Sequence, residues 1–424
     1  MKKRVNVMTF IILFLIGLLV FGSLITGCKK ESKEVMLTLG SWRVDDVKQV
    51  EKLIEAFNTK YPEIKIKFDP TNPPEYNSVL RTQLEGGTAP DLFYTRSFAI
   101  TRDLYNEGFL EPLTDLPGIK ENFTDAALSP WATDDGVPYS VPFMAVSHGI
   151  YYNIDLFNQL GINVPKTWED LMAAAKTIKA AGKVPFANGS KDEWDMAEIV
   201  FMNLAPNFIG GREGRLEYES GKRPFNDENI VAAFQACKDL APYLPKGQEA
   251  VSYYDAQQLF LQGEAAMFFG GSWDIATFEK ENPSFKWSVF ATPPKAGQTK
   301  EYICFHMDAG IGLNKASKNK DAAKKFLSWL TTKEAATVLG NEIPGFFPIV
   351  KEKITLTNKH ANAFLALNNG RELDVRFVWP KLLTGNPSGY NLIMYGTIDV
   401  IKGKKTPKQA ADELQKGLAE WYKP

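Results

Sequence analysis

The stretch Ala265–Asp274 reads Ala-Ala-Met-Phe-Phe-Gly-Gly-Ser-Trp-Asp. Its apolar start predicts a buried strand, which ends at the Gly270-Gly271 pair. Glycine leaves bare backbone that another molecule can approach, and open α/β sheets bind ligands beyond the carboxyl ends of their strands. We therefore interpret residues 270–274 as one wall of a binding site. The local pattern fits equally a strand-to-helix turn in which Trp273 fills the core and Asp274 caps the helix.

The N-terminal segment has the features of a secretory signal. Lys2, Lys3 and Arg4 precede a mainly apolar stretch, Val5–Val20, and Ile25-Thr26-Gly27-Cys28 is followed at once by a charged tether. A positive region, an apolar region and a final small residue are typical of export signals. The tetrapeptide resembles a bacterial lipobox, which implies removal of residues 1–27 and lipid attachment to the thiol of Cys28. The alternative is an uncleaved transmembrane anchor.

The composition limits the function and the number of domains. Removing residues 1–27 takes away three positive charges and no acid, so the formal net charge changes from −1 to −4. This balance does not favour nucleic-acid binding. Cys237 and Cys304 form no spacing motif, and we expect two buried free thiols. The roughly 390 residues after the tether exceed what one core usually supports, so we expect two domains.

The periodicity after the tether predicts an α/β chain. Residues 35–40 form a strand, 47–57 a helix and 64–68 a second strand, and this order favours a parallel sheet. Two pairs of strand-like segments, within 139–153 and 302–313, are interpreted as passages between domains with joints at 145–148 and 306–309. We expect Thr167 and Asp170 to form a capping box, and residues 210–223 to form a polar loop.

Motifs spread along the chain resemble the extracellular solute-binding proteins of carbohydrate ABC importers, known as bacterial solute-binding protein family 1. The resemblance covers roughly Val35 to Tyr422. Its motifs are individually weak but occur in the family's order behind a lipobox: Thr88-Ala89-Pro90-Asp91-Leu92, Tyr151-Tyr152-Asn153-Ile154-Asp155-Leu156-Phe157, Pro165-Lys166-Thr167-Trp168-Glu169-Asp170-Leu171, Gly263-Glu264-Ala265-Ala266-Met267 with Gly271-Ser272-Trp273, Gly310-Ile311-Gly312-Leu313 and Ala322-Ala323-Lys324-Lys325-Phe326-Leu327.

The resemblance implies an α/β fold of two lobes, like that of periplasmic binding proteins. Each lobe would be a mainly parallel sheet flanked by helices, and the chain would cross the hinge more than once. We expect the N-lobe to comprise residues 35–145 and 309–355. The C-lobe would comprise residues 146–308 and 356–424.

A sugar presents an apolar face and a rim of hydroxyls, so its site needs flat rings and a few fixed polar groups. The family motif places a cleft aromatic at Trp273, which makes it the preferred candidate. Each of the others has a structural alternative, such as a core ring, a helix cap or a solvated loop. The full set of candidates is Trp42, Arg43, Asp45, Tyr76, Thr95, Arg96, Ser97, His148, Trp194, Asp195, Gly271, Ser272, Trp273, Asp274, Asp308, Phe346, Arg376 and Trp379.

Three candidate loops contain arginine, which is unusual for a neutral-sugar site. If two of Arg43, Arg96 and Arg376 face the cleft, bidentate pairing with an acidic sugar such as a uronate becomes plausible. If they face solvent, the expected ligand is a neutral sugar or short oligosaccharide.

The resulting prediction is a monomeric, lipid-anchored receptor on the outer face of the cytoplasmic membrane. It would bind a mono- or oligosaccharide, close around it and deliver it to an ABC permease. An exported glycan-acting enzyme is the alternative, but the chain has no Gly-x-Ser-x-Gly or His-Glu-x-x-His motif. No cofactor or metal site is expected. A purely structural lipoprotein is a further alternative, and it predicts no ligand-dependent change in melting temperature.

Overall fold

The computed structural model describes residues 34–424, so the expectations for residues 1–27 and for Cys28 lie outside the described residues. Within these residues, nine strands form one continuous sheet whose main path has the order β2-β1-β3-β8-β4-β6-β5, while β7 pairs with β4 and β9 with β8. The strands are β1 (Val35–Ser41), β2 (Ile64–Pro70), β3 (Leu92–Arg96), β4 (Val141–Asn153), β5 (Val184–Phe186), β6 (Ala265–Gly271), β7 (Trp287–Phe290), β8 (Tyr302–Leu313) and β9 (Glu372–Asp374).

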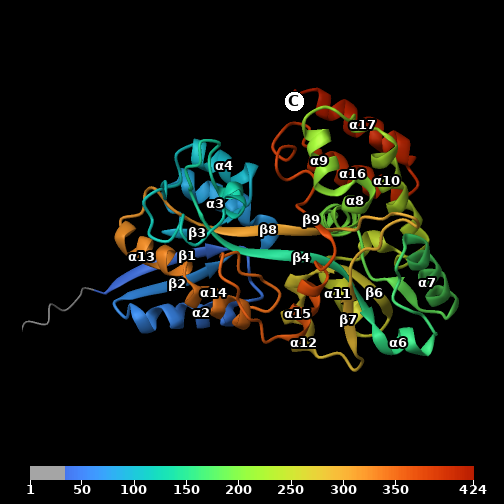
Figure 1. Ribbon diagram of the computed structural model, residues 1–424, viewed down its shortest axis with the longest axis horizontal. Coiled ribbons are helices and arrows are strands. Elements are labelled where there is room, and N and C mark those ends of the chain that lie inside the picture. The colour runs from blue at the N-terminus through green and yellow to red at the C-terminus, as the bar shows by residue number, and fades with distance from the viewer. Residues whose placement is uncertain (1–33) are drawn as a thin grey trace, which may run out of the picture.

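The long strands β4 and β8 run from one lobe into the other (Figure 1). They pair antiparallel, with a register shift on either side of Met144. A third connection follows α14 (Lys333–Glu342), where Phe347 bridges to Ala145. The sequence predicted a joint within each passage, but each is one unbroken strand. Extended backbone persists because β4 pairs with β6, β7 and β8 along its length, which leaves no unpaired segment to form a turn.

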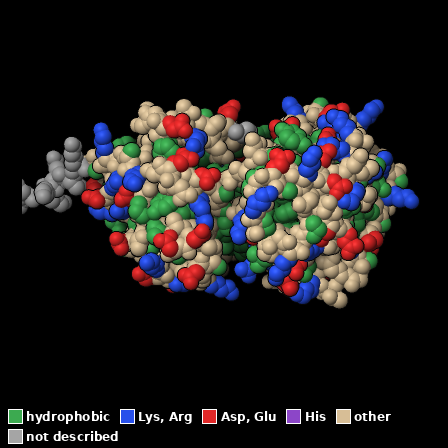
Figure 2. Space-filling view, turned by 90° about the horizontal axis from the view of Figure 1, so that it is seen from above, with side chains coloured by type: hydrophobic (Ala, Val, Ile, Leu, Met, Phe, Trp, Pro, Cys, Tyr) green, Lys and Arg blue, Asp and Glu red, His purple; other side chains and the backbone are tan. Residues whose placement is uncertain are grey.

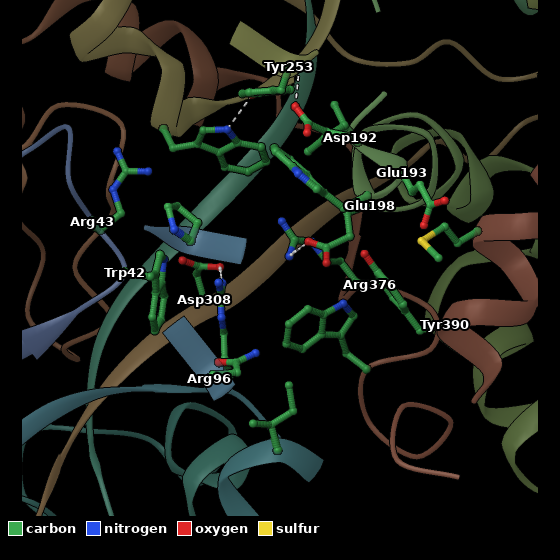
Figure 3. Close-up of a pocket in the computed structure, with 18 of the residues that line it drawn as sticks. Trp42, Arg43, Arg96, Asp192, Glu193, Glu198, Tyr253, Asp308, Arg376 and Tyr390 are labelled. Carbon is green, nitrogen blue, oxygen red and sulfur yellow. Dashed lines mark hydrogen bonds and ion pairs between the residues drawn. The ribbon is translucent and has the colours of Figure 1, made fainter. Parts of the chain in front are cut away.

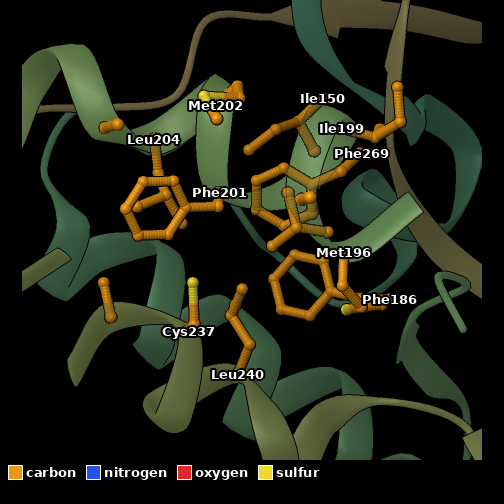
Figure 4. Close-up of a cluster of buried hydrophobic side chains, with 14 of the residues drawn as sticks. Ile150, Phe186, Met196, Ile199, Phe201, Met202, Leu204, Cys237, Leu240 and Phe269 are labelled. Carbon is orange, nitrogen blue, oxygen red and sulfur yellow. The ribbon is translucent and has the colours of Figure 1, made fainter. Parts of the chain in front are cut away.

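Two hydrophobic clusters divide the molecule, and the space-filling view shows two masses meeting at a narrower waist (Figure 2). The smaller cluster comes from residues 37–146 and 309–346. The larger cluster draws on residues 145–290 and 347–418, and its centre packs Phe186, Phe201 and Phe269 together (Figure 4). The fold is therefore the expected two-lobed α/β fold, with each lobe built around its own core.

The sheet is less parallel than predicted. The pairs β1–β2, β1–β3 and β5–β6 are parallel, as the helical crossovers require. However, β8 pairs antiparallel with β3 and β4, and β4 pairs antiparallel with β6 and β7. Strands that cross between lobes enter each sheet against the direction of its neighbours, so the sheet is mixed.

Helices cover both faces of the sheet (Figure 1). In the N-lobe they are α2 (Val47–Lys60), α3 (Pro73–Glu85), α4 (Ala99–Asn106), α5 (Asp125–Leu128), α13 (Lys320–Leu330) and α14 (Lys333–Glu342). In the C-lobe they are α6 (Ile154–Gln159), α7 (Trp168–Ala180), α8 (Met202–Ile209), α9 (Gly211–Glu219), α10 (Glu228–Leu240), α11 (Tyr253–Leu261), α12 (Ile275–Glu281), α15 (Lys359–Ala366), α16 (Gly389–Ile401) and α17 (Pro407–Ala419).

Local predictions had mixed outcomes. The capping box of Thr167 and Asp170 is confirmed at the start of α7, and Cys237 and Cys304 are buried free thiols, as expected. The polar loop expected at 210–223 is wrong, because most of it forms α9. The Arg215 side chain in α9 is buried against Asp374, so a strongly charged segment gains tertiary support that its composition does not reveal.

Candidate functional site

A cavity of about 710 Å³ lies between the lobes (Figure 3). Segments that follow the carboxyl ends of β1 and β6 contribute to its wall, together with Arg96, the last residue of β3. This placement follows the general rule for ligand sites in open α/β sheets. The C-lobe adds the start of α11, a π-helical segment (Asp195–Phe201) and the first turns of α16.

Eleven of the eighteen predicted side chains line this cavity. They come from segments as far apart as residues 42 and 379, which the fold brings together: Trp42, Arg43, Asp45, Arg96, Trp194, Trp273, Asp274, Asp308, Phe346, Arg376 and Trp379.

Three N-lobe candidates lie behind the cavity wall. Tyr76 is buried and its hydroxyl donates to a main-chain carbonyl of β3 at 2.7 Å. Thr95 points into the lobe and donates to Ser140 at 3.0 Å, and Ser97 lies 3.3 Å from the ring of His306. Side chains alternate along a strand, so Arg96 faces the cavity while Thr95 does not.

The other candidates that miss the cavity support its wall. A Cβ on Gly271 would lie 2.1 Å from the indole of Trp273, so the chain's own ring covers the bare backbone that we had assigned to a ligand. The Ser272 hydroxyl donates to the carbonyl of Gly345, and the buried Asp195 accepts hydrogen bonds from Asn188 and from a backbone N–H. His148 lies beneath the wall and contacts Trp273 edge-on, with ring centroids 5.2 Å apart.

The turn after β6 is held by a hydrogen-bonded chain. Trp273 Nε1 donates to the Tyr253 hydroxyl at 2.8 Å, and that hydroxyl donates to the Asp274 carboxyl at 2.8 Å. Gln257 and the Gly271 N–H also donate to Asp274, and burial raises the pKa of Asp274 to about 7. Asp274 is thus a cap of its own turn whose side chain also borders the cavity.

The aromatic side chains of the wall fall into two groups. Trp42 and Trp379 are each 3% exposed, and Phe346 is 1% exposed, so they back the polar groups in front of them. Rings that keep accessible surface beside the cavity are those of Trp194, Tyr254, Trp273 and Tyr390. These four have the geometry for stacking on a flat apolar face.

Arg43 and Arg96 line the N-lobe side, and each has a carboxylate partner. Arg43 Nε donates to Asp46, and this carboxylate raises the pKa of Arg43 although burial opposes it. Arg96 Nη1 lies 3.9 Å from Asp308, and its guanidinium lies 3.8 Å above the Trp42 ring. Burial lowers the pKa of Arg96, and the charge of Asp308 counteracts this effect.

Arg376 lies on the C-lobe side between two indoles. Its Nη1 donates to Glu198 at 2.7 Å and its Nε donates to His148 Nε2 at 3.3 Å. The guanidinium carbon is 5.6 Å from the ring of Trp273 and 5.4 Å from that of Trp379. Burial and the neighbouring guanidinium lower the pKa of His148 far below its usual value, which fits a neutral imidazole that accepts this hydrogen bond.

The sequence predictions missed Tyr253, Gln257, Glu198 and Tyr390. One signal was available: Ser252 and Asp255 form a capping box, which starts α11 at Tyr253. Glu198 was also visible as a carboxylate within an apolar run. Nothing local indicated that the first turns of α16 line the cavity and bring Tyr390 to its wall.

The wall offers hydrogen-bond donors, hydrogen-bond acceptors and aromatic rings. Among residues 34–424, no cluster of three or more His, Cys, Asp or Glu side chains could hold a metal ion. The helices of this part of the chain are all too short or too polar to cross a membrane. A polar and aromatic cavity between two lobes that share strands is the arrangement of a protein that binds a small solute.

Comparison with known proteins identifies the family. Residues 41–337 match the model of the bacterial extracellular solute-binding proteins, and the chain belongs to this family. It is 29% identical to a binding protein of Brucella abortus (strain 2308) over 82% of this chain and 84% of that protein. It is 26% identical to a multiple sugar-binding protein of Streptococcus mutans serotype c (strain ATCC 700610 / UA159) over 68% of each chain.

A solved chitin oligosaccharide binding protein shares the fold, with a TM-score of 0.78 and 24% identity over 91% of this chain and 98% of that one. The family therefore makes the chain an extracellular solute-binding protein rather than an enzyme.

Proposed function

We propose that the protein is a lipid-anchored receptor that binds a sugar or oligosaccharide between its lobes and delivers it to an ABC importer. One observation carries the ligand class: rings with accessible faces, such as Trp273 and Trp194, lie beside paired donors and acceptors in one cavity. A saccharide needs this combination, because its ring has an apolar face and its hydroxyls both donate and accept. The sugar-binding relative supports the same class.

The cavity also suggests how binding would drive closure. Its wall comes from both lobes, since Arg96 lies on a strand of the N-lobe, while Arg376 and Trp194 belong to the C-lobe. A ligand that contacts both sides binds the closed arrangement more tightly than an open one. Closure would then present a different face to the permease than the unliganded receptor does.

The division of the chain and its attachment are parts of the same proposal. We assign residues 35–145 and 309–355 to the N-lobe and 146–308 and 356–424 to the C-lobe. The two hydrophobic clusters support this division except at Ala145, Val146 and Phe347, each of which packs in the cluster of the other lobe. Residues 1–27 would be removed on export, and Cys28 would carry the lipid that keeps the monomeric receptor near its permease. Mass spectrometry of the membrane fraction would detect a diacylglyceryl group on Cys28.

A saccharide screen tests the function. Mono- and oligosaccharides are added to the purified protein while the melting temperature and tryptophan fluorescence are recorded. A ligand present at 100 times its Kd should raise the unfolding free energy by about 2.7 kcal/mol, and binding next to Trp273 should change the emission. Absence of both effects across the panel would refute sugar binding. Release of shortened products would instead favour the glycan-acting enzyme.

A further inference from the structure

We propose that Glu198, Asp308 and Asp46 determine the charge specificity of the cavity. By neutralising the three arginines of the wall, they make the site select uncharged saccharides and reject uronates. This inference rests on the proposed function, because it assumes that the ligand is a sugar. It concerns which sugars can bind, which the fold and the family leave open.

The strongest case is the pair of Arg376 and Glu198. Their side chains are 4% and 18% exposed, and Nη1 of the arginine lies 2.7 Å from a carboxylate oxygen of the glutamate. The guanidinium carbon lies 5.6 Å from the ring of Trp273 and 5.4 Å from that of Trp379. Glu198 and His148 already accept hydrogen bonds from Nη1 and Nε. A ligand carboxylate would therefore have to share this buried guanidinium with Glu198.

The two N-lobe arginines are restricted in a similar way. Asp308 lies 3.9 Å from Arg96, and Trp42 covers one face of that guanidinium. Arg43 donates to Asp46 and lies over the ring of Phe346. Figure 3 shows Asp308 close to Arg96, and Glu198 joined to Arg376 by a dashed line. A uronate bound at Arg43 or Arg376 would have to compete with Asp46 or Glu198 for a mostly desolvated guanidinium, which is unfavourable. At Arg96 its negative charge would lie beside that of Asp308.

The total charge of the cavity wall also opposes the binding of an anion. Six carboxylate side chains and four basic ones line the cavity, so acids outnumber bases even when Asp274 is protonated. A neutral sugar avoids this repulsion while its hydroxyls still find donors on the arginines and acceptors on the carboxylates. The three arginines that lead a reader of the sequence to expect an acidic ligand are therefore compensated within the fold.

The test compares matched sugars by isothermal titration calorimetry. Galactose and glucose, and their oligosaccharides, are each paired with the corresponding uronate. The wild-type protein should bind the neutral member of any accepted pair at least about tenfold more tightly than its uronate. Glu198→Gln keeps the side-chain shape and frees Arg376, so it should improve uronate affinity about tenfold. Asp308→Asn should act in the same direction through Arg96.

A matched control separates local from global charge. Glu219 accepts from the buried Arg215 at 2.6 Å, outside the cavity, so Glu219→Gln changes the net charge equally without freeing a cavity arginine. Uronate affinity should stay within about twofold of wild type in this variant. Circular dichroism melts identify folded variants.

Three outcomes decide the matter. If the wild-type protein binds a uronate as tightly as its neutral partner, the charge inference is overturned while sugar binding stands. If Glu198→Gln and Asp308→Asn both fold and neither gains uronate affinity, these carboxylates do not set specificity. If the wild-type protein binds no saccharide of either kind, the proposed function itself fails.

Discussion

Replacing Trp273 with alanine perturbs the site and the fold at the same time. The indole lines the cavity, packs against both hydrophobic clusters and starts the hydrogen-bonded chain through Tyr253 to Asp274. It also covers Gly271 and meets the ring of His148. We expect the variant to fold and to bind its ligand much more weakly.

The size of each effect follows from this environment. Truncation of an aromatic anchor in a binding site costs about 2 kcal/mol or more, which weakens Kd about 30-fold at 1.4 kcal/mol per decade. A fully buried Trp→Ala change destabilises a protein by about 3–5 kcal/mol. Trp273 keeps accessible surface in the cavity. Its replacement should therefore cost less than that of a fully buried tryptophan, about 2 kcal/mol of unfolding free energy.

Calorimetric titration with the sugar found in the screen measures the loss of affinity, and urea unfolding measures the loss of stability. Trp273→Phe keeps a ring but loses the hydrogen bond to the Tyr253 hydroxyl, so the unfolding free energy should fall by a smaller amount, about 1 kcal/mol. Trp287→Ala removes a buried indole of the same lobe outside the cavity and should reduce stability without changing Kd. Affinity within about threefold of wild type in the Trp273→Ala variant would remove this residue from the site.

Gly271→Ala should weaken binding about tenfold, because its Cβ would lie 2.1 Å from the Trp273 indole; unchanged affinity and tryptophan emission would contradict this. Burial raises the pKa of Asp274 to about 7 and that of Asp195 to about 8 from 3.8. Both carboxyls bind protons more tightly in the folded state, so their stabilisation is complete below pH 3.8 and is lost as pH rises through their folded pKa values. Urea titrations should show this loss between about pH 4 and 8, and a double Asp→Asn variant should lack it; an equally steep decline in that variant refutes the assignment. Burial raises the pKa of the Cys237 and Cys304 thiols, so an electrophilic thiol reagent should modify them only after unfolding. Peptide mapping of the treated native protein should find both residues unmodified, and modification of either would contradict this prediction.

Much of the fold was predictable because its signals are local. Alternating and helical periodicity located β1, α2 and β2, and the Thr167 capping box located α7. The unbroken course of β4 and β8 was not predictable, because pairing with distant strands keeps them extended. Likewise, α9 gains its support from an ion pair between residues 215 and 374, which are far apart in sequence.

The candidate site shows the same division. The loop positions of Arg43, Arg96 and Arg376 could be read from the chain, and all three line the cavity. Their partners could not, because Glu198 and Asp308 reach them through tertiary packing. Orientation was the other unknown. Adjacent residues such as Thr95 and Arg96 face opposite ways, and a shift of one residue in a strand exchanges them.

The shared strands β4 and β8 also bear on how the molecule unfolds. Each contributes main-chain hydrogen bonds to both lobes, so neither lobe can lose its part of these strands without exposing an edge of the other. Unlike domains joined by a linker, the lobes are coupled in stability. Heating should therefore give one calorimetric transition, and a fragment that ends within either strand should not fold as an independent lobe.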